Sequence, residues 1–222
     1  MIAAERSTST DPRTELARHD VRAVVMGGSA GAVDGLLEVL PSLPATLAVP
    51  VLVVVHVPPR AAIGAADVYG ERCPLPVREA VDKEELAAGA VLFAPADYHL
   101  LVEDDGRVAL SVDPPVHFSR PAIDVLFETA SRVFASRLLG VLFSGASEDG
   151  AAGMAAIRRA GGLAWVESPL TAAQPLMPAA ALRDAPGARA LTIPEMIDAL
   201  AALPHGSSAQ RRKETAVAGS PS

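Results

Sequence analysis

Three short segments of the chain combine residue types that could catalyse acyl transfer. The first is Gly27-Gly28-Ser29-Ala30-Gly31, which follows an apolar run and matches the pattern G-x-S-x-G. Glycines allow a sharp turn that exposes the serine hydroxyl, and the helix predicted next offers unpaired N–H groups to a developing oxyanion. A nucleotide-phosphate loop or a tight structural turn could have the same composition. By itself, this segment leaves the role of Ser29 open.

The second segment begins at His56, which ends another apolar run. If the two runs form neighbouring strands, their ends lie about 4.8 Å apart, and His56 could act as general base for Ser29. A Rossmann dinucleotide site instead has an acidic residue at this point to bind the ribose, so His56 argues against a nucleotide site. A histidine at the end of a strand can also be purely structural.

The third segment runs from Ser144 to Gly150 and contains two carboxylates. Asp149 or Glu148 could orient the imidazole, which is the third role in a catalytic triad, whereas Asp149 could also simply cap the next helix. The order Ser, His, Asp differs from the Ser, Asp, His order of α/β-hydrolases, and no HGGG-type loop occurs. An ordinary lipase or esterase is therefore disfavoured.

Elements that could position these segments alternate along the chain. Short apolar runs predict strands at 21–26, 51–57, 90–94, 138–143, 163–166 and 190–193, and helical patterns lie at 32–40, 121–135, 151–160, 179–182 and 194–203. Asp105-Gly106 predicts a hairpin between 99–102 and 107–112. We expect an α/β fold with a doubly wound, mostly parallel sheet, helices on both faces and one antiparallel hairpin. Ligands of such sheets bind beyond the carboxyl ends of the strands, where the three segments fall.

Composition limits the domain organisation and the partners. We expect one catalytic domain over 21–204, a disordered arm over 1–20 and a disordered tail over 205–222. The net charge of -7 argues against nucleic acid as a partner. The most apolar run, 47–57, is shorter than the roughly 20 residues of a membrane-spanning helix, so we expect no membrane insertion. A single cysteine permits no disulfide within the chain, and we expect a cytoplasmic protein.

Six segments together resemble the catalytic domain of the chemotaxis protein-glutamate methylesterases, over about 21–203. They are Gly28-Ser29-Ala30-Gly31, His56-Val57-Pro58-Pro59, Ala94-Pro95-Ala96-Asp97-Tyr98-His99-Leu100-Leu101, Ser119-Arg120-Pro121-Ala122-Ile123-Asp124-Val125-Leu126-Phe127, Ser144-Gly145 through Asp149-Gly150-Ala151-Ala152-Gly153, and Met177-Pro178-Ala179-Ala180. The resemblance implies a serine hydrolase that removes methyl groups from glutamyl esters of methylated chemoreceptor-like proteins. It also implies deamidation of receptor glutamines, without metal or organic cofactor.

By the same resemblance, Ser29 is the nucleophile, His56 the general base and later acid, and Asp149 the residue that orients His56. Backbone N–H groups near Ala30 and Ala146 are candidates for the oxyanion hole. Gly28 and Arg120 complete the expected cleft. Arg120 could contact an acidic substrate there or could lie at the surface without such a role. For His99 and His117 we weigh a place near the cleft against a structural or surface role.

The chain also departs from the family pattern. Family members usually have a hydroxyl residue and two glycines where this chain has Ala30, Gly31 and Ala32, and a methionine where it has Ala146. These changes motivate one alternative, a catalytically weakened relative that binds a signalling partner. A nucleotide-binding α/β protein is another. Only about 20 residues precede the first predicted strand, too few for the receiver domain of the full-length family protein. We therefore expect a free-standing enzyme or one controlled by a regulatory partner.

Overall fold

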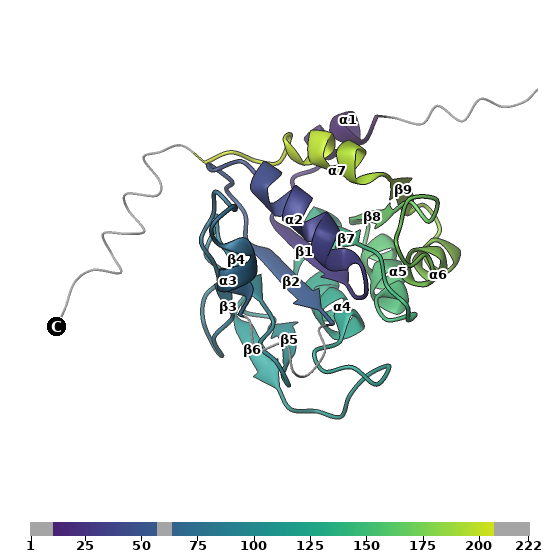
Figure 1. Ribbon diagram of the computed structural model, residues 1–222. Coiled ribbons are helices and arrows are strands. Elements are labelled where there is room, and N and C mark those ends of the chain that lie inside the picture. The colour runs from purple at the N-terminus through teal and green to yellow at the C-terminus, as the bar shows by residue number, and fades with distance from the viewer. Residues whose placement is uncertain (1–10, 57–63, 207–222) are drawn as a thin grey trace, which may run out of the picture.

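A parallel sheet forms the centre of the computed structural model, which describes residues 11–56 and 64–206 (Figure 1). Its strand order is β3-β4-β2-β1-β7-β8-β9, and all six pairings are parallel. The strands are β1 (Ala23–Gly28), β2 (Val51–Val55), β3 (Val77–Glu79), β4 (Val91–Phe93), β7 (Leu138–Leu142), β8 (Leu163–Glu167) and β9 (Arg189–Leu191). Strands β5 (His99–Val102) and β6 (Val108–Ser111) form a separate antiparallel hairpin. The predicted fold class is confirmed.

The central strands are apolar on both faces because helices cover both sides of the sheet. All residues of β1, β2, β7 and β8 are buried. One core contains α1 (Pro12–Ala17), α2 (Ala32–Ser42) and α7 (Ile193–Leu200), and Tyr69 of α3 (Ala65–Tyr69) joins it. The other core contains α4 (Ile123–Phe134), α5 (Ala151–Arg159), α6 (Leu176–Asp184) and the β5–β6 hairpin. The sheet is thus the middle of three layers.

The expected disordered arm over 1–20 is wrong for the part of it that the structure describes as α1. Asp11 caps this helix, accepting the N–H of Thr14 at 3.2 Å, and Pro12 occupies its first position. Leu16 is buried in the core beside α7, next to which α1 lies at the top of Figure 1. The short helix is stabilised because Leu16 packs into the apolar core beside α7. Residues 1–10 lie outside the described part of the chain.

The expected tail over 205–222 begins with two residues that are ordered. His205 forms an antiparallel bridge with Leu47, and the Gly206 N–H donates to the Thr46 carbonyl at 2.7 Å. The remaining residues, 207–222, lie outside the described part, so this prediction stays untested there. Among the described residues, no helix is both long enough and apolar enough to cross a membrane.

Candidate active site

The sheet register brings Ser29 and His56 side by side. Gly28, the last residue of β1, pairs with Val55, the last residue of β2, and the His56 N–H donates to the Gly28 carbonyl at 3.0 Å. Ser29 and His56 are the next residues of two parallel strands, whose backbones run about 4.8 Å apart. The placement predicted from the sequence is therefore confirmed for the backbone of both residues.

Gly28 and Gly31 shape the turn that carries Ser29. Gly31 has a φ of 85° and is the N-cap of α2, and a Cβ on it would lie 2.6 Å from the Cβ of Ala173. Gly28 is buried, and a Cβ there would lie 2.4 Å from the Cβ of Ala32. Ser29 itself is partly exposed. Tight packing on both sides thus holds a strand-to-helix turn with the serine at its accessible edge.

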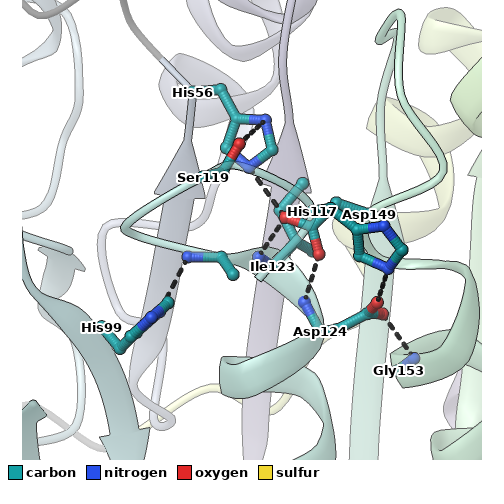
Figure 2. Close-up of polar contacts among 9 residues, drawn as sticks. His56, His99, His117, Ser119, Ile123, Asp124, Asp149 and Gly153 are labelled. Carbon is teal, nitrogen blue, oxygen red and sulfur yellow. Dashed lines mark hydrogen bonds and ion pairs between the residues drawn. The ribbon is translucent and has the colours of Figure 1, made fainter. Parts of the chain in front are cut away.

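His56 bonds to Asp149, as Figure 2 shows. The imidazole Nε2 lies 2.8 Å from the Asp149 Oδ2, with the imidazole largely buried and the carboxylate fully buried. An ionised carboxylate only accepts hydrogen bonds, so Nε2 carries the proton and the neutral ring has its lone pair on Nδ1. This Nδ1 lies 3.5 Å from the Ser119 hydroxyl. The nitrogen available as a base is therefore Nδ1.

Asp149 is held by two helix N–H groups besides His56. Its Oδ2 accepts from the Ile123 N–H at 2.7 Å and its Oδ1 from the Asp124 N–H at 2.9 Å, so the carboxylate caps the start of α4 (Figure 2). Burial acts to raise the pKa of Asp149, but the bonds from His56, Asp124 and Ile123 outweigh it and hold this pKa below its usual value. The carboxylate is thus ionised and fixed before any substrate arrives.

The alternatives left open for the third segment are now decided by geometry. Glu148 is exposed and forms an ion pair with Arg183 at 3.2 Å. Asp149 does cap a helix, but that helix is α4 rather than α5, which begins at the N-cap Gly150 without a side-chain cap. The carboxylate that orients His56 also fastens another helix of the fold.

Two backbone N–H groups near Ser29 are free to bind an oxyanion. Within the described residues, neither the Ala30 N–H nor the Ala146 N–H has a hydrogen-bond partner, and both residues are exposed. By contrast, the Ser29 N–H donates to the Ser144 carbonyl at 2.9 Å, and the Gly145 N–H to the Gln174 carbonyl at 3.1 Å. Both predicted donors are thus unpaired in the described part of the chain.

Arg120 stabilises the loop before α4 through hydrogen bonds to backbone carbonyls. Its Nη1 donates to the carbonyls of Val112 and Asp113 at 2.9 and 3.1 Å, while its buried Nε has no partner among the described groups. His99 also has a structural role, since its buried ring accepts the Ala122 N–H at 3.2 Å and lies 3.2 Å from the Pro114 carbonyl. Neither side chain contacts His56 or Asp149 in these hydrogen bonds.

Ser119 and Asp124 are site residues that the sequence reasoning missed. Asp124 is buried; its Oδ1 accepts the Gly153 N–H at 2.7 Å and its Oδ2 lies 3.4 Å from His117 Nε2 (Figure 2). Burial raises the pKa of Asp124 to about 6, opposed by the Gly153 N–H and His117 and reinforced by Asp149. Both residues stand in the segment around Arg120-Pro121, but only the folded loop brings them to His56 and Asp149.

No group of three or more His, Cys, Asp or Glu side chains suited to a metal ion occurs among residues 11–56 and 64–206. The His56 ring instead contacts the Asp149 carboxylate and the Ser119 hydroxyl, and the unpaired N–H groups of Ala30 and Ala146 lie in the loops after β1 and β7. Such a set can move a proton between a serine and a leaving group and can stabilise an oxyanion.

Comparison with known proteins places the chain among methylesterases. The family model described as CheB methylesterase matches residues 24–200. A relative from Leptospira interrogans, to which methylesterase and glutaminase activities are assigned provisionally, is 43% identical over 160 residues, which are 72% of this chain and 83% of the relative. The protein-glutamate methylesterase/protein-glutamine glutaminase of Symbiobacterium thermophilum is 45% identical over 150 residues, 68% of this chain but 41% of that protein.

The fold comparison agrees with the sequence comparison. The crystal structure of the Thermotoga maritima CheB methylesterase catalytic domain matches with a TM-score of 0.75 and 27% identity. The match covers 81% of this chain and 97% of that domain.

Proposed function

The chain belongs to the CheB methylesterase family, and from this premise we propose that it is a protein-glutamate methylesterase that hydrolyses glutamyl methyl esters through an acyl-enzyme on Ser29. The observation that carries the proposal is the 2.8 Å bond between His56 and the buried Asp149, at a strand end whose register neighbour is Ser29. A base already oriented beside a serine at a helix N-terminus is the arrangement that nucleophilic acyl transfer needs.

Acylation starts with the Ser29 hydroxyl, which attacks the ester carbonyl while His56 Nδ1 takes its proton. The ionised Asp149 stabilises the resulting imidazolium through Nε2. The Ala30 and Ala146 N–H groups donate to the oxyanion of the tetrahedral intermediate. The intermediate then collapses, the C–O bond to the methoxy group breaks, and Nδ1 returns the proton so that methanol leaves.

Deacylation reverses the roles with water in place of methanol. His56 Nδ1 takes a proton from water, the hydroxide attacks the glutamyl-serine ester, and Ser29 leaves with the proton from His56. A glutamate side chain is released. The same steps on a glutamine side chain release ammonia, so glutaminase activity is part of the proposal.

The remaining residues of the expected cleft support the site without touching the ester. The Gly28 carbonyl accepts the His56 N–H, and the lack of a side chain on Gly28 leaves room for the Ala32 side chain. Arg120 holds the carbonyls of Val112 and Asp113 and thereby the loop that carries Ser119. We assign both to the positioning of the catalytic groups.

The proposed substrate is a methylated chemoreceptor-like protein, and the proposed compartment is the cytoplasm. A regulatory partner is also part of the proposal. The proposal names no nucleic acid and no membrane insertion.

The test is methanol release from receptor membranes methylated in vitro, with the wild-type chain and Ser29→Ala. We expect release by the wild type and loss of at least roughly 10³-fold in Ser29→Ala, as for removal of a nucleophile. Equal release by the two proteins, or none by the wild type, would contradict the proposal.

A further inference from the structure

Ser144 occupies the place in the fold where three loops at the carboxyl edge of the sheet meet. It follows β7, is fully buried, and lies between the turn that carries Ser29 and the loop 168–175, which joins β8 to α6. Its backbone N–H, its carbonyl and its hydroxyl are all engaged in hydrogen bonds. A residue bonded in this way can set the relative position of the loops that it joins.

The bonds to the Ser29 turn come from two different groups of Ser144. Its carbonyl accepts the Ser29 N–H at 2.9 Å, and its hydroxyl donates to the Ala30 carbonyl at 2.8 Å. The Ser29–Ala30 peptide unit, which carries the free Ala30 N–H, therefore lies between two anchored groups. The carbonyl of this planar unit accepts the Ala32 N–H at 2.9 Å, and the Ser144 bonds to the two neighbouring units restrict the ψ of Ser29 and the φ of Ala30, about which the unit could turn.

The hydroxyl of Ser144 is fully used by its neighbours. It has one proton, and the Ala30 carbonyl at 2.8 Å is closer than the Gln174 carbonyl at 3.4 Å. It also accepts the Gln174 N–H at 2.8 Å. Gly31 leaves room for this arrangement, because a Cβ on Gly31 would lie 2.8 Å from the hydroxyl oxygen.

Glu167, the last residue of β8, holds the backbone of Ser144 from the neighbouring strand. Its Oε2 accepts the Ser144 N–H at 2.8 Å, and the residue is buried. Burial raises the pKa of Glu167, opposed by the Ser144 N–H and reinforced by Glu38. The bond needs one acceptor oxygen rather than a charge, so a glutamine amide can replace the carboxyl group.

We infer that Ser144, held by Glu167, is a positioning residue. It directs the Ala30 N–H toward the oxyanion that forms when Ser29 attacks the ester carbonyl. This inference rests on the proposed function. In it, the buried Ser144 holds one donor of the oxyanion hole in its catalytic orientation before substrate binds. Loss of one oxyanion-hole donor lowers kcat by roughly 10²–10³-fold, so a misdirected donor should lower it by about 10- to 100-fold.

A fluorophosphonate probe tests the inference without any receptor substrate. The probe phosphonylates an activated serine irreversibly, with a P–O bond formed and fluoride released. Its saturation kinetics separate the maximal rate, kinact, from the binding constant, KI. We expect Ser144→Ala to lower kinact by about 10- to 100-fold with KI within about twofold. Glu167→Ala should lower kinact in the same way, whereas Glu167→Gln should keep it within about threefold of wild type.

Ser147→Ala is the matched control in the same loop. The buried Ser147 hydroxyl has no hydrogen-bond partner among the described groups, so its removal breaks no bond. We expect kinact of this variant to match the wild type. A Ser144→Ala value within threefold of wild type would overturn the inference. If Ser144→Ala does not unfold cooperatively, the decision passes to Glu167, and equal kinact for Glu167→Ala and Glu167→Gln would overturn it.

The methylesterase activity and the role of Ser144 are tested by different outcomes. Probe labelling of the wild type without methanol release from receptors would remove the proposed substrate and leave the role of Ser144 measurable. An unlabelled wild-type protein would overturn both.

Discussion

At the scale of single residues, Asp149 has two tasks that share one carboxylate. Three donors reach its two oxygens, the His56 ring and the N–H groups of Ile123 and Asp124. In the proposed mechanism the first bond serves catalysis, and the other two fix the start of α4. A change at this position should therefore affect activity and folding together.

Asp149→Asn should lower kcat/KM by roughly 10²–10⁴-fold and the free energy of unfolding by about 1–3 kcal/mol, because an amide has one acceptor oxygen for three donors. Ester hydrolysis and urea unfolding measure the two effects. The adjacent Glu148→Gln is the control, since its exposed pair with Arg183 contributes little, and both quantities should stay near wild type. Similar behaviour of the two variants would contradict the assignment of Asp149.

The buried Asp124 should make folding sensitive to mild alkalinisation from acid pH. Its pKa rises from 3.8 in the unfolded chain to about 6 in the fold, so the folded state binds more protons between these values. Stability contributed by this group is therefore present below about pH 4 and is lost as the pH rises to about 6. His117, Asp149 and Glu128 are the charged groups that influence it.

Asp124→Asn should remove this loss, because an amide does not titrate and still offers an acceptor to the Gly153 N–H. The measurement is the free energy of unfolding in urea from pH 4 to pH 7 for both proteins. We expect the wild type to lose stability relative to the variant as the pH rises through this range. Parallel pH profiles would contradict the raised pKa.

At the scale of elements, the sequence predicts the long and strongly patterned segments well. The apolar runs that became β1, β2, β7 and β8 are buried on both faces, and Asp105-Gly106 does form the turn between β5 and β6, with a φ of 80° at Gly106. Short elements were missed. The helix α3 has five residues and the strand β3 three, too few for a periodicity to appear.

The missed helix α1 had a readable start signal in Asp11-Pro12, but its stability depends on a distant surface. Leu16→Ala should lower the free energy of unfolding by about 2–4 kcal/mol, because it empties a buried site beside α7. Arg13→Ala, which removes an exposed ion pair with Asp198 across the same contact, should cost less than about 1 kcal/mol. Chemical denaturation checks both, and a loss below 1 kcal/mol for Leu16→Ala would show that α1 does not pack in solution.

At the scale of the whole molecule, one sheet edge assembles a site from residues far apart in the sequence. The strand-end rule predicted Ser29, His56 and Asp149, because each follows a buried parallel strand. It could not predict that the loop before α4 would bring Ser119 to His56, nor that Asp149 would cap α4, since these contacts depend on how loops pack over the edge. Tertiary packing, and not local pattern, decides such partners.

The same packing brings a second hydroxyl to the base, which makes the identity of the nucleophile the sharpest question for the molecule. Ser29 follows β1 at the start of a helix with two free N–H groups nearby in the proposed oxyanion hole. Ser119 lies 3.5 Å from His56 Nδ1 in a loop. Of the two serines, Ser29 lies both next to the base His56 and at the N-terminus of a helix. We therefore expect acyl transfer to proceed through Ser29.

The most direct measurement is to trap the acyl-enzyme. The chain is mixed with p-nitrophenyl acetate, quenched in acid within the first turnover, digested, and mapped by mass spectrometry. We predict an acetyl group on Ser29 in the wild type, loss of this adduct in His56→Ala, and an unchanged adduct on Ser29 in Ser119→Ala. An acetyl group on Ser119, or no covalent adduct in the wild type, would contradict the assignment of Ser29 as the nucleophile.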